Sequence, residues 1–135
     1  MKELLVEAKK ESLRAVSAFA EAELEAVDCP VDIRRELSIA IDELFGNIAQ
    51  YAYEAGTGPV SVRFDLEQET RTVVFTFQDG GTPFDPLAMD EPDTTLKARE
   101  RKIGGLGIFL VKKMMDEVRY AYRDGKNVLT IRKKI

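Results

Sequence analysis

The feature that most constrains the fold is a change in hydrophobic spacing near residue 56. Before it, apolar residues recur every three or four positions in two stretches, as in amphipathic helices. The first stretch begins at about Ser12, and the second follows Cys29 and Pro30, with Asp32 as its expected cap. The apolar positions are Leu13, Val16, Ala20, Leu24 and Val27 in the first helix, and Ile33, Leu37, Ile41, Leu44, Ile48 and Tyr51 in the second.

Beyond the turn residues 56–59, apolar and polar residues alternate with the two-residue period of a half-buried strand. The expected strands span 60–66, 72–78, 118–123 and 127–132, and residues 2–7 favour a short edge strand. Asp124 and Gly125 separate the last two strands and form a favoured hairpin turn pair. Residues 106–115 return to helical spacing through Leu106, Leu110, Val111, Met114 and Met115.

This order of elements predicts an α+β fold, because helices and antiparallel strands occur without regular βα alternation. We expect a two-layer sandwich with a mostly antiparallel sheet and the helices on one face. The chain has 135 residues, of which 44% are hydrophobic, so residues 1–135 are expected to form a single domain.

Histidine is absent, which removes the commonest general base, so any catalysis must use carboxylates, amides and backbone groups. The net charge of -4 argues against nucleic-acid binding. The single Cys29 cannot form an internal disulfide, and no apolar run approaches the roughly 20 residues of a membrane span. The amino terminus lacks the pattern of a secretory signal, so we expect a cytoplasmic protein without a membrane partner.

The first candidate site lies on the second predicted helix. Glu43 and Asn47 are four residues apart, so they project from the same face, which we expect to lie beside the apolar stripe. A carboxylate there can accept a proton, and an amide oxygen is a neutral ligand for Mg²⁺. The pair alone also fits an ordinary solvated helix face.

Two glycine-containing segments supply further candidates. Asp79, Gly80 and Gly81 end a strand, where the glycines allow a sharp turn and a close ligand, although an ordinary Asp-Gly turn has the same sequence. Residues 104–107 run directly into a helix, whose free backbone N–H groups suit phosphate. This run follows no predicted strand and lacks the P-loop lysine, so neither the Rossmann nor the Walker pattern is satisfied.

Residues 79–105 carry three prolines and weak periodicity, which predicts a long loop. Long loops in compact domains often cover a binding site, so we expect a lid at about 85–104.

Along the chain, the helix with Glu43 and Asn47 comes first, then the strand that ends at Asp79, the lid, and the glycine run before a helix. In this order, the motifs resemble the three nucleotide-binding boxes of the Bergerat-fold (GHKL, histidine-kinase-like ATPase) superfamily. The matching segments are 36–53, 79–86 and 104–120. Two finer patterns resemble the RsbW-like anti-sigma-factor serine/threonine kinases. They are Asp79-x-Gly81-x-Pro83-Phe84-Asp85-Pro86 and Gly105-Leu106-Gly107-Ile108 to Met115-Asp116-Glu117-Val118.

The resemblance implies a role for each candidate. Asn47 would hold Mg²⁺ through its side-chain oxygen, and Glu43 would act as the general base. Asp79 would bind the adenine amine of ATP, and Gly81 would allow close packing to the base. The phosphates would be bound by the backbone N–H groups of Gly105, Leu106 and Gly107. The γ-phosphate would be neutralised by one basic residue of the lid, among Lys97, Arg99, Arg101 and Lys102. The alternative is that these four residues only balance the acidic side chains of the loop.

The resemblance also implies an activity and partners. By this resemblance, the protein is expected to transfer phosphate from ATP to a serine of an anti-anti-sigma (STAS-type) antagonist and to sequester a sigma factor. It also implies a homodimer, without identifying the interface. The alternative is a nucleotide-dependent protein-binding regulator without kinase activity. The presence of both Glu43 and Asn47 favours the kinase.

Overall fold

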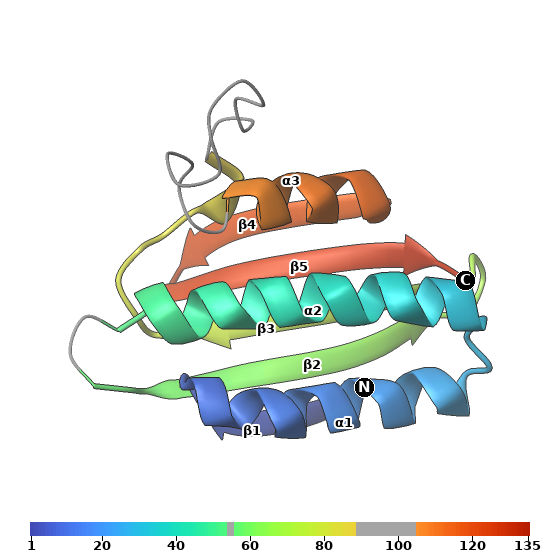
Figure 1. The fold of residues 1–135 in the computed structure, drawn as a ribbon, viewed down its shortest axis with the longest axis horizontal. Helices are drawn as coiled ribbons and strands as arrows, with labels where there is room; N and C mark the ends of the chain where they lie inside the picture. Colours follow the sequence, from blue (N-terminus) through green and yellow to red (C-terminus); the bar gives the residue numbers. More distant parts are fainter. Residues whose placement is uncertain (54–55, 89–104) are drawn as a thin grey trace.

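The computed structural model describes residues 1–53, 56–88 and 105–135. Within these ranges, five strands form one antiparallel sheet in the order β1-β2-β3-β5-β4 (Figure 1). The strands are β1 (Lys2–Glu7), β2 (Pro59–Glu67), β3 (Thr72–Asp79), β4 (Glu117–Arg123) and β5 (Lys126–Lys134). The helices are α1 (Leu13–Ala26), α2 (Val31–Tyr51) and α3 (Gly105–Met114), with 3-10 turns η1 (Lys10–Ser12) and η2 (Pro86–Ala88). The predicted α+β class is therefore confirmed.

The helices form one layer on a single face of the sheet, as Figure 1 shows. The long helix α2 crosses the middle of the sheet and contacts α1 on one side and α3 on the other. Helix α1 also contacts β1 and β2, whereas α3 contacts β4. No helix in the described part of the chain is long and apolar enough to cross a membrane.

The core lies between these two layers. Strand β2 buries Val60, Val62 and Phe64 toward the helices, while the residues between them are less buried, as the alternating pattern predicts. The largest fully buried side chains come from both layers and include Phe45, Leu37 and Leu44 of α2. Removing each such side chain from water contributes about 1.5–3 kcal/mol, so the sheet and α2 stabilise each other.

The helices differ from the sequence predictions at three residues. Asp32 was expected to cap α2, but the N-cap is Pro30, and no capping side-chain hydrogen bond forms there. The φ of −57° at Pro30 already suits the helix entry, which leaves Asp32 in the first turn. Tyr51 is 38% exposed because it lies in the last turn of α2, and Leu110 is 45% exposed because α3 turns Ile108 and Val111 inward instead.

The β4–β5 hairpin confirms the predicted turn. Asp124 and Gly125 have positive φ values of 53° and 74°, and Arg123 pairs with Lys126 across this two-residue connection. The hairpin sets the register of β5 against β4, whereas a separate pairing of β5 with β3 places Asn127 opposite Asp79. The pairing of β5 with β3, and not the turn, therefore determines which side chain lies beside the acidic end of β3.

Candidate functional site

Asn47 is buried, with 8% of its surface exposed, in the inward face of α2. The prediction that this face lies beside the apolar stripe is wrong for Asn47, since it lines a pocket together with Leu44 and Ile48. Its amide nitrogen is buried without a hydrogen-bond partner among the described residues. A buried amide normally finds a partner, so this side chain retains unused polar capacity in the pocket.

Glu43 lies one turn earlier on α2 and meets the first turn of α3. A Cβ added at Gly107 would lie 2.1 Å from Cδ of Glu43, so the glycine allows this close approach. Burial raises the pKa of Glu43, while the neighbouring Asn47 side chain acts in the opposite direction. The structure thus places a partly desolvated carboxylate beside the N-terminus of a helix.

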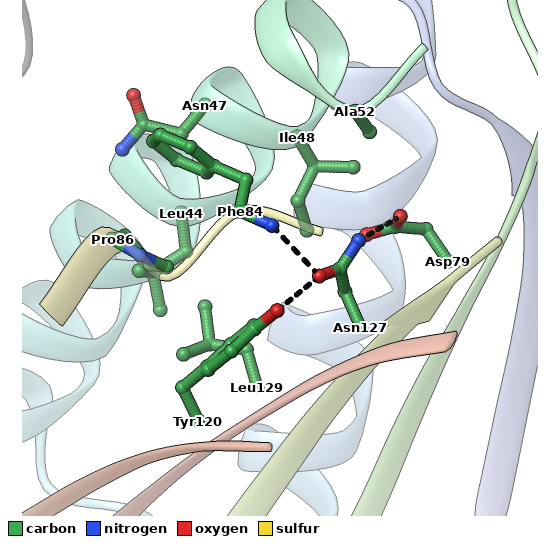
Figure 2. Close-up of a pocket in the computed structure, with 10 residues that line it drawn as sticks. All are labelled: Leu44, Asn47, Ile48, Ala52, Asp79, Phe84, Pro86, Tyr120, Asn127 and Leu129. Atoms are coloured by element: carbon green, nitrogen blue, oxygen red, sulfur yellow. Dashed lines mark hydrogen bonds between the residues drawn. The ribbon is translucent and has the colours of Figure 1, made fainter. Parts of the chain in front are cut away.

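Asp79 is 4% exposed at the end of β3. Its Oδ1 accepts hydrogen bonds from the backbone N–H of Gly81 at 2.9 Å and from Nδ2 of Asn127 at 3.0 Å. No described residue donates a hydrogen bond to Oδ2 (Figure 2). One carboxylate oxygen is therefore held in place, and the other remains as an acceptor.

Gly81 packs against the end of α2 with no room for a side chain. A Cβ there would lie 2.0 Å from the carbonyl oxygen of Ala52, which also accepts a hydrogen bond from Thr82 N–H at 2.7 Å. The close contact that the structure shows for Gly81 is thus with α2, while its contact with a ligand remains a prediction.

Three polar residues of this region were missed by the sequence predictions. Tyr53 accepts a hydrogen bond from Gly80 N–H at 3.0 Å and donates one to the carbonyl of Pro59 at 2.8 Å. Asn127 and Tyr120 lie on β5 and β4 and donate to Asp79 and to Asn127, respectively. A signal existed for Asn127, since this polar residue holds an inward position two residues before the buried Leu129.

A pocket joins these elements beneath the segment that leaves β3 (Figure 2). Its lining residues are Leu44, Asn47, Ile48, Ala52, Asp79, Phe84, Pro86, Tyr120, Asn127 and Leu129. The cavity measures only about 20 Å³, roughly the space of one water molecule. The Phe84 ring lines it and packs on Tyr51 with a centroid distance of 5.4 Å. Phe84 therefore helps to bound a cavity that is too small for a flat ligand in this conformation.

The start of α3 lies at the same end of the molecule as the ends of α2 and β3 in Figure 1, and residues near the ends of α2 and β3 line the pocket. A family model for the histidine kinase-like ATPase domain matches residues 6–133, almost the whole chain. The chain belongs to this histidine kinase-like ATPase family. The resemblance inferred from the three motifs is thereby confirmed.

Relatives of this ATPase domain include bacterial protein kinases. It is 30% identical over 99 residues to the serine/threonine-protein kinase BtrW of Bordetella bronchiseptica, covering 73% of this chain and 69% of BtrW. It is 35% identical over 100 residues to the serine-protein kinase RsbW of Bacillus licheniformis, covering 69% and 60%. It is 29% identical over 120 residues to RsbW of Halalkalibacterium halodurans, covering 86% and 72%. The match thus spans about three fifths to three quarters of these relatives' length.

The ATPase domain brings the predicted site residues together in two groups. Asp79 and Asn47 line the pocket, and Gly81 donates to Asp79. Glu43 meets Gly107 at the start of α3. Helix α3 begins at Gly105, so its first backbone N–H groups have no partner within the helix. Four predicted lid bases lie outside the described residues, namely Lys97, Arg99, Arg101 and Lys102, as does most of the predicted lid.

The described residues contain no group of three or more acidic or cysteine side chains placed to hold a metal ion. Mg²⁺ at phosphate sites usually keeps several waters and needs only one or two protein ligands besides the phosphates. Asn47 lines the pocket and carries a side-chain oxygen, so it fits this requirement as a single neutral ligand.

Proposed function

We propose that this chain is an ATP-dependent serine protein kinase of the anti-sigma-factor type. It transfers the γ-phosphoryl group of ATP to a serine of an anti-anti-sigma (STAS-type) protein and sequesters a sigma factor, in the cytoplasm and as a homodimer. The observation that carries the proposal is the contact of Glu43 with the first turn of α3, next to a pocket that contains an acidic acceptor. The names of the kinase relatives BtrW and RsbW support the same reaction.

The pocket is the proposed adenine site. Asp79 keeps Oδ2 as an acceptor, and an exocyclic amine can donate to it. The pocket walls are largely apolar, as a flat base requires, and Ile48 and Leu129 belong to them. Guanine also carries an exocyclic amine that a carboxylate can accept from, so the choice of adenine rests on membership of the ATPase family.

The start of α3 is the proposed phosphate site. The first N–H groups of α3, those of Gly105, Leu106 and Gly107, have no partner within the helix, and the positive end of the helix dipole lies there as well. Both favour an anion at this place. Asn47 would hold Mg²⁺ through its oxygen, and the ion would neutralise phosphate charge during transfer. One of the basic residues among Lys97, Arg99, Arg101 and Lys102 would contribute further positive charge.

Glu43 is the proposed catalytic residue. Its carboxylate meets the helix start that would hold the phosphates, so it can accept the proton of a serine hydroxyl or orient that hydroxyl for attack. Burial raises the pKa of Glu43, which makes its carboxylate a stronger base than an exposed glutamate. The attacking oxygen would bond to the γ-phosphorus as the bond to ADP breaks.

A second function uses the same pocket without chemistry, as a nucleotide-dependent regulator that only binds its partners. Glu43→Gln separates the two functions, because it preserves size and hydrogen bonding but cannot take a proton. The phosphate acceptor is the partner protein captured from the host with the tagged chain in the presence of ATP. We expect the affinity for ATP with Mg²⁺ to remain close to wild type, while transfer to this captured partner falls about 10²–10⁴-fold.

Both quantities should be measured on one preparation, with Asp79→Asn as the matched variant that weakens nucleotide binding instead. Equal transfer rates for Glu43→Gln and wild type would remove Glu43 from the catalytic role. A wild-type chain that binds nucleotide but phosphorylates no captured partner would favour the binding regulator.

A further inference from the structure

Asn127 is a buried polar residue that neither the motifs nor the proposed catalytic roles require. It is 5% exposed, in the inward row of β5 that otherwise holds Leu129 and Ile131. A buried primary amide is costly unless its polar atoms find partners. Its presence in the wall of the pocket therefore calls for a specific reason.

The amide of Asn127 uses its whole hydrogen-bonding capacity within the chain, and Figure 2 shows its bonds to Asp79, Phe84 and Tyr120. Its nitrogen donates to Oδ1 of Asp79 at 3.0 Å and to the carbonyl of Thr82 at 2.9 Å. Its oxygen accepts from the backbone N–H of Phe84 at 3.1 Å and from the hydroxyl of Tyr120. Two donor hydrogens and two acceptor positions are thus all occupied, so Asn127 has none left for a ligand.

These bonds connect the acidic end of β3 to the segment that closes the pocket. Gly81 N–H and Asn127 together hold Oδ1 of Asp79, which leaves Oδ2 as its available acceptor. The same amide holds the backbone of Thr82 and Phe84, and the Phe84 ring lines the pocket. The carboxylate and this wall therefore share one support, the side chain of Asn127.

We propose that Asn127 is a positioning residue that sets the adenine specificity of the pocket by fixing the Asp79 carboxylate and the 82–84 segment as one unit. Because this role requires Asp79 to bind the adenine amine, it rests on the proposed function. It adds a residue whose contribution comes through Asp79 and Phe84, without contact to the nucleotide.

The test compares two ligands that differ only in the amine that Asp79 would bind. These are ADP and purine riboside 5′-diphosphate, each with Mg²⁺, and the readout is the ratio of their dissociation constants. For wild type we expect ADP to bind about 10- to 100-fold more tightly, the range for one hydrogen bond to a charged group. A purely structural defect would weaken both ligands and leave the ratio unchanged.

The matched variants are Asn127→Val and Asn127→Thr, which have nearly the same shape and both suit a strand. Each loses the bonds to Thr82 and Phe84, but only threonine has a hydroxyl that can donate to Asp79. We expect the ratio to fall to within about threefold of one in Asn127→Val and to stay near the wild-type value in Asn127→Thr. In both variants, the Phe84 amide hydrogen should exchange at least about tenfold faster than in wild type.

Each result has a defined meaning. If Asn127→Val keeps the wild-type ratio while wild type discriminates, the positioning role is overturned and the proposed function stands. If wild type binds neither ligand, the proposed function fails and the positioning role fails with it. Should Asn127→Val not fold, Tyr120→Phe removes only the hydroxyl bonded to Asn127, and we expect the ratio to fall about two- to fivefold. An unchanged ratio in that variant would also overturn the role.

Discussion

Gly107 of α3 lies directly against the carboxylate of Glu43 on α2. A Cβ at residue 107 would stand 2.1 Å from Cδ and 2.2 Å from Oε1 of Glu43, closer than any real contact. The clash falls on the far end of a flexible side chain, so the glutamate would move while the helices stay in place. The glycine thus maintains the position of a proposed catalytic group.

Gly107→Ala is therefore expected to lower phosphoryl transfer at least about tenfold, while the free energy of unfolding changes by less than about 1 kcal/mol. Transfer assays and urea unfolding measure the two effects. Gly46→Ala is the matched control, since no atom lies within 4 Å of a Cβ at that position in α2. It should preserve transfer and stabilise the helix by up to about 1 kcal/mol. Equal transfer by Gly107→Ala and wild type would mean that Glu43 needs no fixed position.

Gly81→Ala should act on stability instead, because its Cβ would lie 2.0 Å from the rigid backbone oxygen of Ala52. We expect the free energy of unfolding to fall by about 1–3 kcal/mol, as for other overpacked sites. At Gly80, the nearest atom to an added Cβ is the Tyr53 hydroxyl at 3.7 Å, an ordinary contact. Gly80→Ala should therefore cost less than about 1 kcal/mol, and a similar loss in both variants would contradict the specific contact with α2.

Phe84→Ala should open the pocket, because the ring lines a cavity of about 20 Å³ and packs on Tyr51. An aromatic pair contributes about 0.5–1.5 kcal/mol, so its loss should raise the association rate of ADP by up to about tenfold. Stopped-flow fluorescence measures this rate. Tyr122→Ala removes an exposed aromatic residue from the β4 hairpin and serves as the control. If Phe84→Ala associates no faster than this control, the ring does not limit entry.

Glu43→Gln should make the protein more stable at neutral pH, in addition to its effect on transfer. Burial raises the pKa of Glu43 above the ordinary value of 4.5, so the folded state favours the protonated carboxyl. This stabilising contribution is fully present below about pH 4.5 and is lost as the pH rises through the raised pKa. Urea unfolding should therefore show Glu43→Gln to be more stable than wild type at pH 7.5, with a smaller difference at pH 4. The opposite sign would mean that the start of α3 stabilises the charged form by more than burial disfavours it.

The sequence by itself determined the local elements and the types of chemical group. Alternation along β2 and helical spacing along α2 follow from the backbone periods, which any chain with these residues shares. Asp124 and Gly125 specify their turn because the residues that tolerate positive φ are few. Glu43 and Asn47 lie on one helix face for the same local reason, so the fold class and the motif positions were predictable.

Only the tertiary structure decided which distant groups meet. Asn127 reaches Asp79 because β5 pairs with β3 in one register, across 48 residues of sequence, and a shift by one residue would turn its side chain to the other face. Gly107 touches Glu43 because α3 packs against α2, and Asp32 lost its expected capping role because Pro30 already starts the helix. Long-range register and packing depend on the summed burial of many residues, which no local pattern contains.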